Sequence, residues 1–166
     1  MAAFEKAVEI AARAHAGQRD KEGRPYLTHA LRVTSRVAEA DPNDLDAQIV
    51  AVLHDVVEDS DVTFDDLRAE GFSERILAAL KLVTHGPDQT YADYVVGCAA
   101  DPIARRVKLA DLHDNTLQSR TMLREGREEK DLARMRKYAL AYQFLTERID
   151  EAAYRRRMAD GSPALG

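Results

Sequence analysis

The stretch AVLHDVVEDSDVT, residues 51–63, decides how this chain folds, because it joins the apolar face of a helix to a dense group of charges. Apolar side chains recur along it, and just before it, at helical spacing: Leu45, Ile49, Val52, Leu53, Val56 and Val57. This spacing predicts one continuous core helix. The polar residues on the same helix are His54, Asp55, Glu58 and Asp59. Burying them costs several kcal/mol per ion unless a partner compensates the charge, so the helix indicates such a partner.

The charged residues of this helix are spaced so that they meet one another. His54 and Glu58 are one helical turn apart, and so are Asp55 and Asp59. Like charges at this spacing repel, and we expect them to raise the pKa values of the neighbouring carboxyl groups. A divalent cation would reverse that penalty, because it would supply the largest charge in the cluster.

Helical spacing of apolar residues continues along almost the whole chain, and no alternating strand pattern is convincing. The expected helices cover residues 4–15, 25–38, 45–59, 63–70, 73–83, 90–99, 102–115 and 128–158. Capping residues support several of them, such as Thr63 with Asp66 and Asp101 with Pro102. The sequence therefore predicts an all-α bundle of about eight helices, with one domain over residues 1–159 and a flexible tail over 160–166.

Composition favours a globular protein without a nucleic acid partner. Hydrophobic residues make up 45% and charged residues 32%, which excludes a disordered chain. The net charge of −5 gives no general attraction for a nucleic acid polymer. For the short basic clusters we favour solvated helix faces over phosphate binding: Arg105-Arg106, Arg134/Arg136/Lys137 and Arg155-Arg156-Arg157. A single cysteine and the lack of an apolar span predict a cytoplasmic protein that does not enter membranes. The sequence leaves open whether the chain forms a homodimer.

Two further polar residues stand where a plain core would be apolar. His29 lies among apolar residues near the start of the second expected helix, and Asp111 lies on an apolar stretch of the seventh. Together with His54 and Asp55 they offer two imidazoles and two carboxylates. Such a set suits Mn²⁺, Fe²⁺, Co²⁺ or Zn²⁺ better than Ca²⁺ or Mg²⁺. From these residues alone, metal binding and satisfied polar groups in the core remain equally open.

Four segments carry a resemblance to a known family, and they occur in order over roughly residues 5–145. They are AHAGQRDKEGRPYLTHALRV, AVLHDVVEDSDVT, LVTHG and RVKLADLHDN. They look like the signature segments of the hydrolase domain of Rel/SpoT-type alarmone enzymes, which also occurs alone in small alarmone (ppGpp) hydrolases. The H…HD…D pattern within them resembles that of the HD-domain phosphohydrolases.

The resemblance implies a helical HD domain that hydrolyses the 3′-diphosphate of guanosine tetra- or pentaphosphate, or related phosphoesters. It implies one divalent ion, usually Mn²⁺, bound by His29, His54, Asp55 and Asp111. Glu58 and Asp59 match the family's acidic pair, to which we assign the catalytic role of orienting water and moving protons. Asn115 matches the asparagine that acts beside the metal.

The segments around the expected substrate depart from the family pattern. Asp20 and Lys21 stand where alarmone hydrolases usually carry a basic pair, His85 where lysine is common, and Leu112 where arginine is usual. None of the expected metal ligands is changed. The comparison predicts an unchanged metal centre beside an altered substrate pocket.

Several residues are candidates for contacts with the substrate, and each has an alternative. The candidates are Asn115, Lys21, Lys108, His85, Arg19 and Tyr26, with Arg24 as a further source of positive charge. Lys108 either meets a phosphate or forms an ion pair with Asp111 or Asp114. His85 either donates to phosphate or caps a turn. Tyr26 either stacks on a base or packs beside its neighbours.

Three functions stay open at this point. The first is an alarmone hydrolase dependent on Mn²⁺. The second is the same chemistry on another nucleotide or small phosphoester, as in a 5′-nucleotidase. The third is a non-catalytic module that binds a nucleotide or a metal, against which the intact Glu58-Asp59 pair argues.

Overall fold

The computed structural model describes residues 3–117 and 123–160, and this part of the chain is all-α, as predicted. Its helices are α1 (Ala3–Ala14), α2 (Leu27–Ala40), α3 (Leu45–Leu53), α4 (Val56–Asp59), α5 (Phe64–Ala69), α6 (Glu74–Val83), α7 (Tyr91–Ala99), α8 (Pro102–Thr116), α9 (Glu128–Leu145) and α10 (Glu151–Ala159). These are more helices than the eight expected, because two expected helices are each divided. The described residues contain no strand, only an isolated bridge between Arg19 and Pro25. Apart from Asp160, the expected tail lies outside the described residues.

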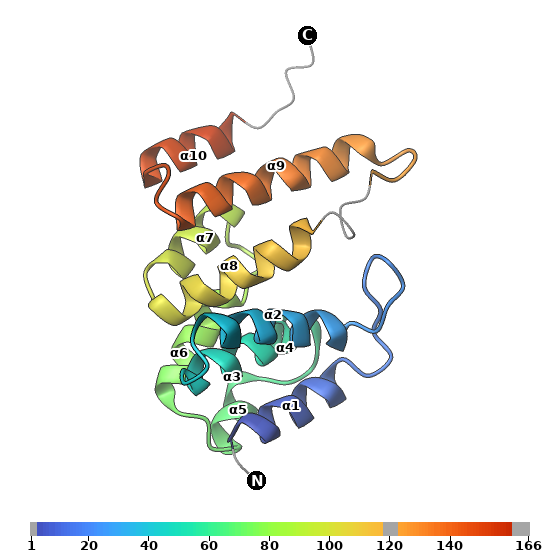
Figure 1. Ribbon diagram of the computed structural model, residues 1–166, viewed down its shortest axis with the longest axis vertical. Coiled ribbons are helices and arrows are strands. Elements are labelled where there is room, and N and C mark those ends of the chain that lie inside the picture. Colours follow the sequence, from blue (N-terminus) through green and yellow to red (C-terminus); the bar gives the residue numbers. More distant parts are fainter. Residues whose placement is uncertain (1–2, 118–122, 161–166) are drawn as a thin grey trace.

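Helix α3 is the centre of the bundle. It packs against α1, α2, α6 and α8, while α1 and α5 lie at one end of the molecule and α9 and α10 at the other (Figure 1). Every residue of α3 from Ala47 to Leu53 is buried. A helix that is apolar on all sides is stable only where neighbours cover it on all sides. The C-terminal end of α3 therefore delivers its next residue, His54, into the interior.

The expected helix over residues 45–59 is interrupted at the charged pair His54-Asp55. Helix α3 ends at Leu53 and α4 begins at Val56, and Asp55 has a ψ of −3°. A regular helix has a ψ near −42°. The His54 Nδ1–H donates to the carbonyl oxygen of Ala51 at 2.8 Å, and a side chain that takes a backbone acceptor in this way is a known cause of helix distortion. The prediction of one continuous helix was wrong at this point.

The expected helix over residues 128–158 is also divided. Helix α9 ends at Leu145, and Glu147 adopts a left-handed φ of 59°. The Asp150 side chain then accepts the backbone N–H of Ala153 and begins α10. The rings of Phe144 and Tyr154 stack at 4.9 Å, so α10 turns back onto α9. The sequence signal for the break was Asp150, a favourable N-cap residue that helical spacing alone overlooks.

The other helix boundaries follow the capping chemistry. Thr63 and Asp66 form a complete capping box at α5, and the Asp101 side chain accepts two backbone N–H groups at the start of α8. The Asp101 cap sets the start of α8, the helix that carries Asp111. None of the helices in the described ranges has the length and apolar character that crossing a membrane requires.

Candidate metal centre and its cavity

The four expected metal ligands meet in the interior of the bundle. His29 comes from α2, His54 and Asp55 from the junction of α3 and α4, and Asp111 from α8. His29 Nε2 lies 3.4 Å from Asp111 Oδ1 and 3.7 Å from Asp55 Oδ2, and His54 Nε2 lies 2.9 Å from Asp55 Oδ2. Ligand atoms of His29, His54 and Asp111 all lie within 4.8 Å of one another. This buried group could hold a divalent metal ion.

The hydrogen bonds of both histidines suit metal binding. His29 Nδ1 lies 2.7 Å from Asp114 Oδ2, and His54 Nδ1 lies 2.8 Å from the Ala51 carbonyl oxygen. Both partners accept hydrogen bonds, so Nδ1 carries the proton in each ring and Nε2 faces the cluster. His54 Nε2 is buried, and although Asp55 Oδ2 lies 2.9 Å away, no hydrogen bond of acceptable geometry joins the two atoms. A buried nitrogen left without a hydrogen bond fits a metal ligand.

The shifted pKa values show that protons on the imidazoles balance the negative charge of the carboxylates in this cluster. Burial acts to lower the pKa of His29, but hydrogen bonds to Asp111 and Asp114 outweigh it and raise the pKa to about 9. Burial acts to raise the pKa of Asp55, but the neighbouring His54 outweighs it and lowers the pKa to about 2. Repulsion between carboxylates, expected to raise the pKa of Asp55, is thus overcome by the imidazole next to it. A divalent ion would replace the protons of the imidazoles.

Asp111 is held from both sides by residues of its own helix. The Lys108 ammonium donates to Oδ2 at 2.7 Å, and the Asn115 amide donates to Oδ1 at 2.5 Å. Burial acts to lower the pKa of Lys108, but Asp111 outweighs it and the pKa is raised well above the ordinary value. Of the two alternatives for Lys108, the structure therefore has the ion pair with Asp111. Neither contact excludes a further role toward the substrate.

The acidic pair on α4 lies beside the cluster. The backbone N–H of His85 donates to Glu58 Oε2 at 3.0 Å, and the Gln18 side chain donates to the backbone oxygen of Asp59 at 2.7 Å. Partial desolvation raises the pKa of Glu58, and the charges of Asp55 and Asp59 add to that rise. The pKa of Asp59 is raised by desolvation and by Asp55. For Glu58 and Asp59, the expectation that neighbouring like charges raise the pKa values of carboxyl groups is met.

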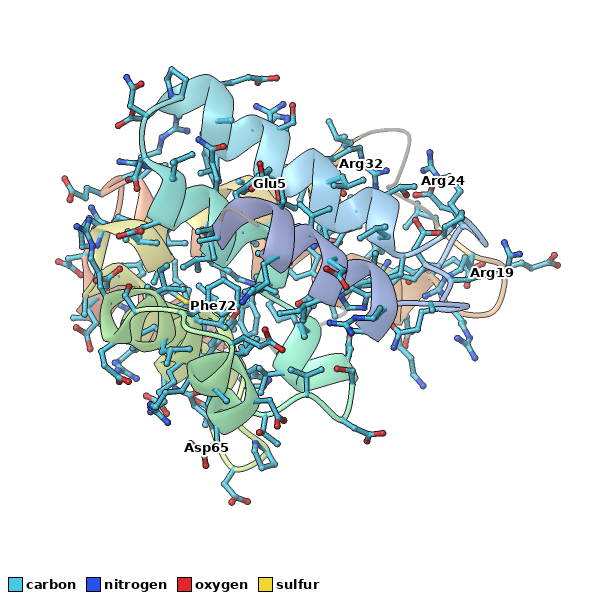
Figure 2. The ribbon with its side chains drawn as sticks, turned by 90° about the horizontal axis from the view of Figure 1, so that it is seen from below. Glu5, Arg19, Arg24, Arg32, Asp65 and Phe72 are labelled. Carbon is cyan, nitrogen blue, oxygen red and sulfur yellow. The ribbon has the colours of Figure 1, made fainter. Side chains whose placement is uncertain are left out.

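A cavity of about 280 Å³ opens onto the cluster. It is lined by Lys21, Tyr26, His29, Asp55, Glu58, His85, Tyr91, Tyr94, Lys108, Asp111, Asn115, Lys137 and Tyr138. The described lining includes five of the six expected substrate contacts but not Arg19, whose guanidinium donates to the Gly23 carbonyl oxygen. Arg19 and Arg24 lie at the same edge of the molecule, on the loop between α1 and α2 (Figure 2). Asp59 is likewise not among the described lining residues.

Sequence reasoning missed several residues of the site. Tyr91 and Tyr94 lie three residues apart on α7, a spacing that could have indicated one shared face. Lys137 was assigned to a solvated face, but it is only partly exposed and lines the cavity. Asp114 lies three residues after Asp111, and this spacing was a usable signal for its contact with His29. The Tyr26 hydroxyl, for which only stacking or packing was considered, donates to Asp55 Oδ2 at 2.6 Å.

The departures from the family pattern have local explanations. Asp20 Oδ1 accepts the backbone N–H groups of Glu22 and Arg24, both at 2.9 Å, so this acid closes its own loop. The His85 ring bonds the Gln89 carbonyl oxygen at 2.8 Å, which is the turn-capping alternative, and it also lines the cavity. Leu112 is 1% exposed and belongs to the hydrophobic core.

Comparison with known proteins agrees with the all-α fold. Residues 7–87 match a family model described as an HD domain. Residues 7–87, just under half of the chain, therefore carry HD-domain sequence. It is 36% identical, over 82% of its length, to a GTP pyrophosphokinase of Streptomyces coelicolor, and 31% identical, over 76%, to a guanosine-3′,5′-bis(diphosphate) 3′-pyrophosphohydrolase of Aquifex aeolicus.

These bacterial relatives are much longer than this chain. The matched region is 17% of the first relative and 19% of the second. A solved structure is similar over nearly the full length of both chains. It is described as a metazoan orthologue of SpoT that hydrolyses ppGpp, and it matches with a TM-score of 0.70 and 26% identity over 97% of this chain and 94% of that one.

Proposed function

We propose that this protein is a metal-dependent phosphohydrolase of the guanosine-3′,5′-bis(diphosphate) 3′-pyrophosphohydrolase type, formed by residues 1–159. The observation that carries the proposal is the convergence of His29, His54, Asp55 and Asp111 at a polar cavity, with Glu58 on its wall. The similarity over nearly full length to a structure described as hydrolysing ppGpp supports the same substrate class.

The same four residues would hold one divalent ion, for which Mn²⁺ is our first choice and Fe²⁺, Co²⁺ or Zn²⁺ are alternatives. When bound, such an ion supplies an activated water and stabilises negative charge on phosphoryl oxygens. The protein contributes a rigid site, because neighbouring side chains already hold the carboxylates of Asp55 and Asp111 in place. Tyr26 bonds Asp55, and Lys108 and Asn115 bond Asp111. Ligands held in this way need little rearrangement when the substrate arrives.

Glu58 is the residue that we assign to proton transfer, with Asp59 in support. The backbone N–H of His85 fixes the Glu58 carboxylate at 3.0 Å, and its pKa lies above the ordinary value. A carboxyl group with a raised pKa exchanges protons more readily near neutral pH, either with the attacking water or with the leaving oxygen. Lys21, Lys108 and Asn115 are suited to bind the phosphate oxygens and leave the proton chemistry to Glu58.

A second candidate is the same reaction on another nucleotide or small phosphoester. It is favoured by Asp20, an acid committed to its own loop where alarmone hydrolases usually have a basic residue. A non-catalytic nucleotide-binding module is the third and weakest candidate.

A substrate panel with identified products separates these functions. The metal-loaded protein is incubated with ppGpp, with deoxynucleoside monophosphates and with other phosphorylated nucleotides, and the products are resolved by anion-exchange chromatography. Release of pyrophosphate and GDP from ppGpp supports the first function. Release of inorganic phosphate from a monophosphate instead supports the second. Binding of metal without turnover of any compound would contradict both.

A further inference from the structure

Lys137 is a cation in the cavity that the proposed chemistry does not yet use. It lies on α9, is partly exposed, and shares the cavity lining with the metal-ligand candidates. Its ammonium nitrogen lies 4.3 Å from the centre of the Tyr91 ring and 5.6 Å from the centre of the Tyr138 ring. In the described part of the chain, no carboxylate forms an ion pair with it. Ring faces orient an ammonium group but leave its full charge in place.

The charged groups that shift the pKa of Lys137 are both cations. Partial burial lowers its pKa, and the neighbouring Lys108 and Arg134 lower it further. Those neighbours are already committed, because Lys108 pairs with Asp111 at 2.7 Å and Arg134 pairs with Asp131 at 2.9 Å. A partly buried ammonium with cationic neighbours, and without an ion-paired carboxylate among the described residues, is stabilised when an anion enters the cavity.

The position of Lys137 indicates which part of a ligand it meets. Lys108 and Lys137 approach the same ring, since the Lys108 nitrogen lies 5.7 Å from the centre of Tyr91. Lys108 belongs to the metal cluster through Asp111, whereas Lys137 pairs with none of the cluster carboxylates. The reacting phosphate belongs at the cluster. An anion at Lys137 would therefore be a second group of the same ligand, beside the Tyr91 and Tyr138 rings and not at the metal cluster.

We propose that Lys137 is a specificity-determining residue that binds the non-reacting phosphate group of a substrate phosphorylated at two positions. The inference rests on the proposed function, and for ppGpp this group is the 5′-diphosphate. Tyr91 and Tyr138 hold the ammonium in the cavity, and the distal phosphates supply the negative charge that no carboxylate of the described chain supplies by ion pairing.

The test is steady-state hydrolysis by the metal-loaded protein of guanosine 3′-diphosphates that carry two, one or no phosphates at the 5′ position. For Lys137→Met we expect KM for ppGpp to rise about tenfold, the effect of losing one charged hydrogen bond, with kcat within about twofold of the wild type. The rise should shrink as the 5′ phosphates are removed, and Lys137→Arg should restore most of the affinity. The matched control is Lys81→Met, since Lys81 also lies over an aromatic ring, Phe64, but outside the cavity.

Equal KM values for wild type and Lys137→Met, or a rise of the same size for all three compounds, would overturn the proposal. If the wild type does not hydrolyse ppGpp, the proposed function fails, and ppGpp then serves as a binding probe in calorimetry. Weaker binding by Lys137→Met than by Lys81→Met would still support the distal phosphate site. Equal binding by both variants, or no binding by the wild type, would overturn it.

Discussion

Replacement of Asp114 by asparagine should weaken metal binding although Asp114 is not itself a ligand. Asp114 is 3% exposed, and its Oδ2 accepts the Nδ1–H of His29 at 2.7 Å. This bond keeps the lone pair of His29 on Nε2, the atom that faces Asp55 and Asp111. An asparagine of the same shape removes the negative charge, and its amide can donate to Nδ1 and favour the wrong tautomer.

The size of the expected loss in metal affinity follows from the effect that hydrogen-bond partners of ligand histidines have in other metal sites. Removing a carboxylate that orients a metal-binding histidine typically lowers affinity by about 10- to 100-fold, or about 1.4 to 2.7 kcal/mol. We expect Asp114→Asn to fall in this range in a competition titration with a Mn²⁺-binding dye. Circular dichroism of the metal-free variant checks that it remains folded.

The control is the other partner of Asp114. Arg32 bonds both carboxylate oxygens of Asp114, at 2.6 and 3.1 Å, and its side chain is 34% exposed. Arg32→Gln leaves the Asp114–His29 bond in place and should change the affinity by no more than about threefold, the effect of a partly exposed ion pair. Wild-type affinity in Asp114→Asn, or an equal loss in Arg32→Gln, would refute the assigned role of Asp114.

Three further predictions concern protons, catalysis and the core. Because the pKa of metal-free His29 is raised to about 9 and that of His54 is also raised, metal binding at neutral pH must displace protons, so affinity should fall as the pH drops below about 9. Calorimetry in buffers of different ionisation enthalpy measures the protons released, and a release of none would contradict the assignment. Glu58→Gln should lower kcat by about 10²- to 10⁴-fold with unchanged metal content. In the wild type, activity on the acid side of the pH–rate profile should be lost at a pH above the ordinary glutamate pKa of 4.5, because Glu58 becomes protonated at a higher pH than usual. Full activity in that variant would remove Glu58 from the mechanism. Leu53→Ala should lower the free energy of unfolding by about 2–5 kcal/mol in urea titration, because Leu53 is fully buried next to His54, whereas exposed Leu31→Ala should change it by about 0.5 kcal/mol or less. Similar losses in both variants would contradict the assigned core.

The parts of the fold that could be predicted depend on local chemistry. Thr63 and Asp66 indicate the start of α5, because a hydroxyl and a carboxylate three residues apart can accept the free backbone N–H groups at a helix N-terminus. The break at Asp55 could not be found in this way. Helical spacing does not show that the His54 ring bonds the Ala51 carbonyl oxygen, which is the contact that distorts the helix there.

The candidate site was predictable to the extent that its residues were unusual for their surroundings. His29 and Asp111 stood out because a histidine and an aspartate are unusual among apolar core residues. The structure brings both to the α3–α4 junction. Lys137 did not stand out, because a lysine among other basic residues on a long helix is usually solvated. Only the packing of α9 against α7 and α8 shows that this lysine faces the cavity.

The most direct test of the whole account is a titration of metal-free protein with Mn²⁺ in which bound metal and pyrophosphate released from ppGpp are measured in the same samples. We predict one ion bound per chain, with hydrolysis rising in parallel, and we predict loss of both in His54→Ala. Saturation with one ion without any release of pyrophosphate, or full activity before any ion is bound, would contradict the proposal that His29, His54, Asp55 and Asp111 form a catalytic metal centre.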